Sequence, residues 1–252
     1  MRRKLVETRA AAQRAIDDGL VRVGANPSPK ASTLVSPDDP VHITEGDAAY
    51  VSRGGLKLAA ALDTYPIDVD GARAVDVGAS TGGFTDCLLQ HGAASVVAID
   101  VGYGQMHWRI RQDERVEVVE KTNIRTADPT SFGGPFDIVV ADLSFISLRT
   151  VTGPLTALGA DHASWILLIK PQFEAGRRDV GKGGIVRDHR VRLRTIAEVA
   201  AAYAECGVHI HGLMRSPISG ASGNIEYVAW FTRDEGTSTI AELVAGLESQ
   251  DP

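Results

Sequence analysis

The sequence is poor in cysteine and lacks a long apolar run, and both absences narrow the class of protein. Cys87 and Cys206 are the two cysteines among 252 residues, and neither stands in a Cys-x-x-Cys or histidine-rich spacing. A disulfide framework or a zinc site is therefore not expected, and the cytoplasm is the natural compartment. No apolar stretch approaches the roughly 18 to 20 residues of a membrane span, and the basic start lacks the apolar core of a signal peptide. We expect a soluble, unexported protein with no membrane or metal partner.

No internal repeat is evident, and the charge is unevenly distributed. An apolar fraction of 44% is ordinary for a globular protein, and the length accommodates one α/β domain plus a small appendage. The net charge is −6, but residues 1–57 hold nine Lys and Arg against seven Asp and Glu, so they carry +2 and the rest of the chain −8. The basic start, Arg2-Arg3-Lys4, fits either phosphate contact or a solvated tail. A nucleic-acid partner is therefore not excluded.

A glycine-rich turn follows the first buried strand pattern, in V-D-V-G-A-S-T-G-G-F at residues 75–84. The pattern predicts a strand, a tight turn and a helix over residues 85–91, with backbone N–H groups that suit a polar or anionic ligand. Ser80 replaces the middle glycine of G-x-G-x-x-G, where its side chain would crowd a pyrophosphate, so a dinucleotide is disfavoured. The same residues match G-x-S-x-G, which makes Ser80 a formal hydrolase nucleophile. We disfavour that reading because no His-Gly-Gly segment precedes a turn that begins the sheet.

S-adenosylmethionine is the third possible ligand of this turn. Asp100 follows a second buried strand pattern, 22 residues after Gly78, where a carboxylate can accept hydrogen bonds from ribose hydroxyls. Asp100 could instead only end its strand and cap the next turn. We favour the cofactor because both the turn and the acidic residue are present.

Four polar residues scattered along the chain have the layout of a catalytic pocket: Lys57, Asp142, Lys170 and Glu226. Asp142 and Lys170 each follow an apolar strand-like run, and Glu226 opens the last one. A mostly parallel sheet could bring them together with Lys57, which stands in S-R-G-G-L-K.

From residue 51 onward, strand and helix patterns alternate as in a doubly wound parallel α/β sheet. Seven strands are expected, at residues 74–77, 96–100, 116–119, 136–141, 165–169, 207–215 and 226–232. The last two flank a loop rich in Gly, Ser and Pro at 216–224, and a helix over 240–247 is expected to pack on the sheet.

The first 46 residues form a separate pattern, with a helix expected over 9–17 and short strands near 20–23 and 41–43. The segment T-R-A-A-A-Q-R-A-I-D-D-G-L-V-R-V-G resembles the RNA-binding domain named after the fourth small-subunit ribosomal protein. In that domain the helix that here bears Arg9 faces RNA, and another helix comes first. The resemblance implies a truncated RNA-binding module at 1–46, a linker at 47–51 and a second domain at 52–252.

The whole chain resembles the TlyA family of bacterial methyltransferases, which join that module to a catalytic domain like those of FtsJ-type ribose methyltransferases. The resemblance rests on V-S-R-G-G-L-K-L, D-V-G-A-S-T-G-G-F-T, D-V-G-Y-G-Q, V-A-D-L-S-F-I-S-L, K-P-Q-F-E and S-G-N-I-E-Y, in the family's order. It implies a seven-stranded Rossmann-like sheet and methylation, from S-adenosylmethionine, of a cytidine ribose 2′-hydroxyl in the ribosomal RNA of one or both subunits. It also implies that the four polar residues are the Lys-Asp-Lys-Glu tetrad.

Further site residues follow from these motifs. The expected cofactor contacts are Gly78, Ser80, Thr81, Gly82, Gly83, Phe84, Asp100, Asp142, Phe145 and Ser222. The expected RNA contacts are Arg3, Lys4, Arg9, Arg53 and Tyr103, with Arg177, Arg178 and Lys182 in a long loop suited to phosphate contact. Phe145 could equally be a core aromatic, and Tyr103 could stack on a nucleobase or cap a turn.

The tetrad suits the chemistry of a ribose hydroxyl, which is a poor nucleophile until it is aligned and relieved of its proton. Burial can lower the pKa of a lysine, so Lys170 could act as base while Lys57 steadies the developing oxyanion. Asp142 and Glu226 would orient the lysines and limit that lowering, so which lysine is neutral stays open.

Three rival functions remain. Methylation of a base amine is disfavoured because D-L-S-F at 142–145 lacks both prolines of the D/N-P-P-F/Y motif. A non-enzymatic RNA-binding or ribosome-assembly protein would not need the tetrad. A haemolysin, a label sometimes attached to the family, predicts a membrane-spanning segment that the sequence does not contain.

Overall fold

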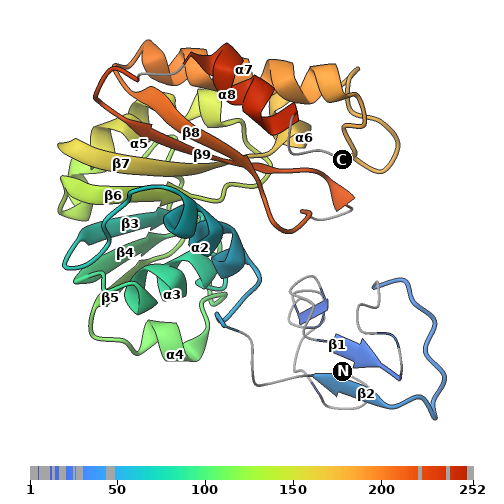
Figure 1. Cartoon of the computed structure of the whole chain (residues 1–252). Helices are drawn as coiled ribbons and strands as arrows, with labels where there is room; N and C mark the ends of the chain where they lie inside the picture. Colours follow the sequence, from blue (N-terminus) through green and yellow to red (C-terminus); the bar gives the residue numbers. More distant parts are fainter. Residues whose placement is uncertain are drawn as a thin grey trace.

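The computed structural model describes residues 5, 12, 15–16, 21–24, 26, 31–43, 49–220, 223–236 and 239–248 of the chain (Figure 1). Near its start, β1 (Val21–Val23) pairs antiparallel with β2 (Val41–Ile43), so both short strands expected there are present. The helix expected over 9–17 lies largely outside the described residues.

Residues 73–232 contain a seven-stranded sheet in the order β5-β4-β3-β6-β7-β9-β8. Its strands are β3 (Arg73–Val77), β4 (Ser95–Ile99), β5 (Val116–Val119), β6 (Phe136–Ala141), β7 (Gly159–Ile169), β8 (His209–Arg215) and β9 (Tyr227–Thr232). The first five are parallel, and β9 runs antiparallel to both β7 and β8. The mostly parallel, doubly wound fold expected from the sequence is therefore confirmed.

Two strands differ from their expected bounds by more than one residue. β7 begins at Gly159 rather than at residue 165, because Gly159 pairs with Phe136 ahead of a register shift while the polar Asp161 and His162 hide the strand pattern. β8 begins at His209 rather than at residue 207, because Gly207 is a left-handed turn residue with a φ of 71°.

Helices cover both faces of the sheet. They are α2 (Gly54–Thr64), α3 (Gly83–Gln90), α4 (Trp108–Arg111), α5 (Thr152–Leu158), α6 (Pro171–Glu174), α7 (His189–Ala204) and α8 (Ile240–Glu248), with 3-10 turns η1 (Pro129–Phe132) and η2 (Leu148–Thr150). The alternation of side chains along each strand divides the core. Val75 packs with residues of α5, α7 and α8, whereas Ala74 packs with residues of α2, α3 and α4. Figure 1 shows α7 and α8 together beside β8. The helix expected over 240–247 is confirmed as α8.

Register brings the important strand ends to one edge of the sheet. Val77 pairs with both Ile99 and Ala141, so the residues that follow β3, β4 and β6 lie side by side. Ile169, at the end of β7, pairs with Tyr227, at the start of the antiparallel β9. An antiparallel strand begins where its parallel neighbours end, so Glu226 reaches the same edge as Asp142 and Lys170.

Candidate active site

A continuous chain of ion pairs links the four polar residues singled out from the sequence. Lys170 Nζ lies 2.5 Å from Asp142 Oδ1, and Lys57 Nζ lies 3.6 Å from Asp142 Oδ2. Lys57 Nζ also donates a hydrogen bond of 2.7 Å to Glu226 Oε2. The order in space is therefore Lys170, Asp142, Lys57, Glu226.

Burial and the two neighbouring carboxylates have opposite effects on the pKa of Lys57. Lys57 and Lys170 are each 8% exposed and Glu226 is 2% exposed. Burial acts to lower the pKa of Lys57, but the charges of Asp142 and Glu226 and their hydrogen bonds outweigh it, so this pKa is raised above its ordinary value. Burial acts in the opposite direction on Asp142, but Lys170 and Lys57 hold its pKa below the usual range. Lys57 is thus a cation and Asp142 an anion at neutral pH.

A close approach of backbones places Lys57 at this edge. A Cβ at Gly83, in the first turn of α3, would overlap Ser52 Oγ and lie 2.9 Å from Gly55 N, so α2 and α3 begin against each other. A Cβ at Gly55 would overlap the Tyr50 side chain. Lys57 follows two residues later on α2, which also contacts β9. Gly55, the second glycine of S-R-G-G-L-K, is therefore required for packing.

Gly55→Ala is expected to lower the free energy of unfolding by about 1 to 3 kcal/mol, because the added methyl group overpacks against Tyr50. Gly54→Ala is the matched control, since its Cβ would lie at ordinary distances of 3.4 Å from Ser52 Oγ and 3.8 Å from Phe84 Cδ1. Urea unfolding of both variants measures the difference, and equal stabilities would contradict the packing role of Gly55.

The glycine turn between β3 and α3 is held to the end of β4 by Asp100. Gly78, Ser80 and Gly82 all have positive φ values, of 87°, 47° and 92°. Asp100 Oδ2 accepts from Ser80 N at 2.8 Å, and Asp100 Oδ1 accepts from Gly102 N at 2.6 Å. A Cβ at Gly78 would lie 2.7 Å from the Asp142 carbonyl oxygen, so the turn passes directly beside the ion-pair chain.

Other expected cofactor contacts differ in their surroundings. Ser80 is exposed and its Oγ donates to Gln105 Oε1 at 3.3 Å, whereas Thr81 is half-buried. The Phe84 side chain is buried in the core with residues of α2 and α4. Ser222 lies outside the described residues.

Exposed aromatic rings flank this edge. Phe145, three residues after Asp142, is 92% exposed, adopts a φ of 64°, and lies 5.3 Å from the Phe173 ring centroid. It is therefore not a core aromatic. Tyr103, in the loop after β4, is 70% exposed, and Lys121 Nζ lies 4.4 Å from its ring centroid.

The expected basic contacts are only partly described. Arg53 is half-buried directly before α2, while Arg177, Arg178 and Lys182 are exposed in the loop between α6 and α7. Arg3, Lys4 and Arg9 lie outside the described residues.

Sequence reasoning missed three residues at this edge. Ser144 Oγ accepts from Lys170 Nζ at 3.0 Å, and Gln172 Nε2 donates to Glu226 Oε1 at 3.3 Å. Each stands two residues after a tetrad member, which is the signal that could have identified it. The third, Asp76, is fully buried and accepts from Thr85 Oγ1 at 2.7 Å, while its Oδ1 has no hydrogen-bond partner among the described residues.

Asp76 is expected to make stability depend on pH. Burial, partly offset by the hydrogen bond from Thr85, raises the pKa of Asp76 from 3.8 to about 7. Between those values the folded chain binds more protons than the unfolded chain, so the free energy of unfolding falls as pH rises, by at most about 1.4 kcal/mol per pH unit. Asp76→Asn should remove this contribution. Urea unfolding between pH 5 and 8 should show the wild type losing stability relative to the variant, and parallel curves would contradict the assignment.

In the part of the chain that the structure describes, no helix has the length and apolar character needed to cross a membrane. The same residues contain no group of three or more His, Cys, Asp or Glu arranged to hold a metal ion.

Comparison with known proteins gives consistent matches. The FtsJ-like methyltransferase family matches residues 50–233. The "16S/23S rRNA (cytidine-2'-O)-methyltransferase TlyA" of Mycobacterium tuberculosis is 47% identical over 249 residues, which are 98% of this chain and 92% of that protein. These similarities extend well beyond the glycine turn.

Two solved structures are similar to this chain, one in both sequence and fold and the other in fold alone. A suspected hemolysin from Streptococcus thermophilus superposes with a TM-score of 0.77 at 38% identity, over 98% of this chain and 92% of that one. An S-adenosylmethionine dependent methyltransferase from Mesorhizobium loti, at 14% identity and a TM-score of 0.52, covers 70% of this chain and 97% of that one, and it shows the fold alone.

Proposed function

The chain belongs to the FtsJ-like methyltransferase family, and we propose that it methylates the ribose 2′-hydroxyl of a cytidine in ribosomal RNA. The observation that carries the proposal is the ion-pair chain Lys170, Asp142, Lys57, Glu226 beside the glycine turn. The name of the Mycobacterium tuberculosis relative supports cytidine as the target, in the RNA of one or both subunits.

The residues around the turn fit S-adenosylmethionine as the cofactor. When bound, it supplies an electrophilic methyl group on a sulfonium. Asp100 stands at the end of β4, where carboxylates accept hydrogen bonds from ribose hydroxyls. Asp76 Oδ1 is a buried acceptor without a protein partner among the described residues, which an ammonium group could satisfy. We propose that Gly78, Ser80, Thr81, Gly82 and Gly83 shape the remaining contacts.

The tetrad offers a partner for the negative charge that develops on the attacking oxygen and an acceptor for the proton that the hydroxyl loses. Lys57 keeps its proton between two carboxylates, so it stabilises the negative charge that develops on the attacking oxygen. We assign proton acceptance to Lys170, because its Nζ has one carboxylate partner, Asp142, and the hydroxyl of Ser144, whereas Lys57 Nζ lies between two carboxylates. Asp142 sets the spacing of the two lysines, and Glu226 holds Lys57 from the other side.

RNA would approach from the exposed edge that carries the aromatic rings. We propose that Phe145 borders the nucleoside and that Tyr103, with Lys121 beside its ring, stacks on a base. Arg53 and the exposed loop residues Arg177, Arg178 and Lys182 are proposed phosphate contacts. Because ribosomal RNA is a cytoplasmic substrate in bacteria, we propose that the protein acts in the cytoplasm.

The other functions explain less of the site. Burying two lysines with two carboxylates costs solvation energy, and a non-enzymatic RNA-binding protein gains nothing from that cost. The hemolysin name of the Streptococcus thermophilus structure belongs to a protein 38% identical to this chain, whereas the methyltransferase name belongs to one 47% identical.

Transfer of a radiolabelled methyl group to isolated ribosomal subunits that lack the modification tests the proposal. We expect label in cytidine, on the ribose 2′-oxygen, which protects the adjacent phosphodiester from alkaline hydrolysis. Cofactor binding without label in either subunit, or label on a base, would contradict it.

A further inference from the structure

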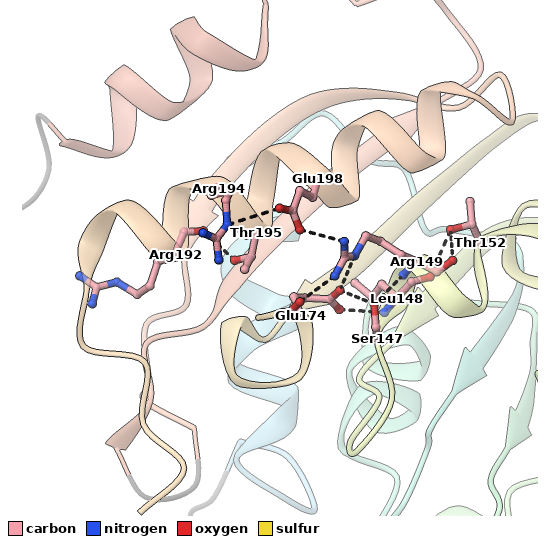
Figure 2. A network of polar contacts seen from close by, with 9 residues as sticks. All are labelled: Ser147, Leu148, Arg149, Thr152, Glu174, Arg192, Arg194, Thr195 and Glu198. Carbon is pink, nitrogen blue, oxygen red and sulfur yellow. Dashed lines mark hydrogen bonds and ion pairs between the residues drawn. The ribbon is translucent and has the colours of Figure 1, made fainter. Parts of the chain in front are cut away.

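One buried carboxylate, Glu174, joins the two segments that carry Lys170 and Asp142. Glu174 ends α6, the short helix that begins directly after Lys170. Its side chain contacts residues 147–149, at the end of the loop that follows Asp142. Figure 2 shows these contacts from close by.

Both carboxylate oxygens of Glu174 accept hydrogen bonds from donors in that loop. Its Oε1 accepts from Leu148 N at 2.7 Å, and its Oε2 accepts from Ser147 Oγ at 2.5 Å and Arg149 Nε at 3.4 Å. Its backbone carbonyl accepts from Arg149 Nη2 at 2.7 Å. The residue is only 4% exposed, so these bonds are largely shielded from water.

The turn from Lys170 to Glu174 is short and internally bonded, so the two residues move together. Phe173 N and Glu174 N donate to the Lys170 carbonyl at 2.8 and 3.3 Å, and Pro171 restricts the backbone at the first helical position. The rings of Phe145 and Phe173 form a second contact between the same two segments. A shift of Glu174 away from η2 would therefore move Lys170 relative to Asp142.

The network continues outward to α7, where its contacts are weaker. Arg149 Nη1 lies 2.8 Å from Glu198 Oε2, and Arg194 Nε lies 3.4 Å from Glu198 Oε1 (Figure 2). The Arg149 side chain is 37% exposed and the Glu198 side chain 38% exposed. Exposed ion pairs contribute little, so the buried part of the network carries most of the coupling.

Stability alone does not account for Glu174. Burial raises the pKa of Glu174 above its usual value even though Ser147, Leu148 and Arg149 donate to the carboxylate. An apolar side chain would avoid this cost, since buried charges often stabilise less than well-packed hydrocarbon. Because Glu174 lies between the segment that carries Lys170 and the segment that carries Asp142, a role in positioning these two residues would explain a buried carboxylate here.

We infer that Glu174 is a positioning residue for methyl transfer: its carboxylate holds the 170–174 turn against η2, so that Lys170 Nζ stays in contact with Asp142 Oδ1. This inference rests on the proposed function, because it takes the Lys170–Asp142 pair as part of the reacting site. Among the residues that the structure describes, no hydrogen bond or ion pair joins the Glu174 side chain to a tetrad side chain.

Glu174→Ala tests the inference, with Glu198→Ala as the matched control at the exposed end of the network. We expect the rate constant of methyl transfer to fall roughly 10- to 30-fold in Glu174→Ala, because a misplaced reacting group slows catalysis. The S-adenosylmethionine Kd and the KM for ribosomal subunits should stay within about twofold, since the contacts near the glycine turn are unchanged. Rates are expressed per cofactor-binding site, which corrects for unfolded protein.

Two further measurements separate positioning from folding. Glu174→Gln keeps an acceptor for Leu148 N–H and a polar partner for Ser147, so it should restore the rate to within about threefold of the wild type. A crystal structure of Glu174→Ala should show Lys170 Nζ beyond hydrogen-bond reach of Asp142. If Glu174→Ala does not fold, Ser147→Ala carries the same test with a smaller expected loss.

The outcomes distinguish this inference from the proposed function. An active wild type whose Glu174→Ala rate per site is unchanged, or falls no more than that of Glu198→Ala, would overturn the inference alone. A wild type that binds cofactor but methylates neither subunit would overturn the proposed function and this inference with it.

Discussion

Replacing Lys170 with methionine is expected to lower the rate constant of methyl transfer at least about 10³-fold, because general base catalysis and the adjoining charge are lost together. Methionine keeps most of the aliphatic volume at a site that is 8% exposed, so folding should survive. Asp142 retains Lys57 as a partner at 3.6 Å and is not left as an unpaired buried charge. Single-turnover transfer of radiolabelled methyl to ribosomal subunits measures the effect.

Arg115→Ala is the control for a general loss of positive charge. Arg115 precedes β5, so it lies at the opposite edge of the sheet from the tetrad, and it pairs with the nearby Asp113 at 2.7 Å. Its activity should match the wild type. A Lys170→Met enzyme that kept more than about a tenth of wild-type activity would remove Lys170 from the role of proton acceptor.

Loss of Asp100 should act on cofactor affinity instead of turnover. Asp100→Ala removes the proposed acceptor for ribose hydroxyls and also releases Ser80 N in the glycine turn and Gly102 N in the loop after β4. Hydrogen bonds to a charged group contribute about 1.5 to 3 kcal/mol each, so the Kd for S-adenosylmethionine should rise on the order of 10²-fold. Isothermal titration calorimetry measures it directly, without RNA.

Asp137→Ala is the matched control for Asp100. Asp137 also accepts a backbone hydrogen bond, from Arg73 N at 2.8 Å, but it stands near the start of β6 and therefore at the far edge of the sheet. Its cofactor Kd should be unchanged. Equal affinities of Asp100→Ala and the wild type would show that the ligand of the glycine turn does not use this carboxylate.

Together these variants separate binding from reaction. Lys170 and Glu174 are expected to affect the rate with little change in cofactor affinity, whereas Asp100 is expected to affect affinity first. The tetrad itself consists of buried charged groups. A lysine buried without a partner would destabilise the fold, and the alternation of lysine with carboxylate lowers that cost.

Several features followed from local sequence patterns. Strands such as β4 and β6 are buried on both faces and contain the continuous apolar runs V-V-A-I and I-V-V-A, and the glycines at 78 and 82 predict a turn that needs positive φ. That Asp142 and Lys170 would be neighbours followed from topology, because the parallel strands β6 and β7 end at the same edge. The length of β7 was less accessible, since Asp161 and His162 interrupt its pattern.

Local patterns were sufficient to predict the sheet, the glycine turn and the residue types of the tetrad, because short-range periodicity and steric rules act on neighbours in the chain. The spacing of the charges depends instead on how the helices and strands pack. Lys57 reaches Glu226, 169 positions away, through the packing of α2 against α3 and β9, and Asp142 together with this 2.7 Å contact to Glu226 outweighs the effect of burial on the pKa of Lys57. Coulomb energy depends on distance and burial, and neither is encoded in any local pattern around Lys57 or Glu174.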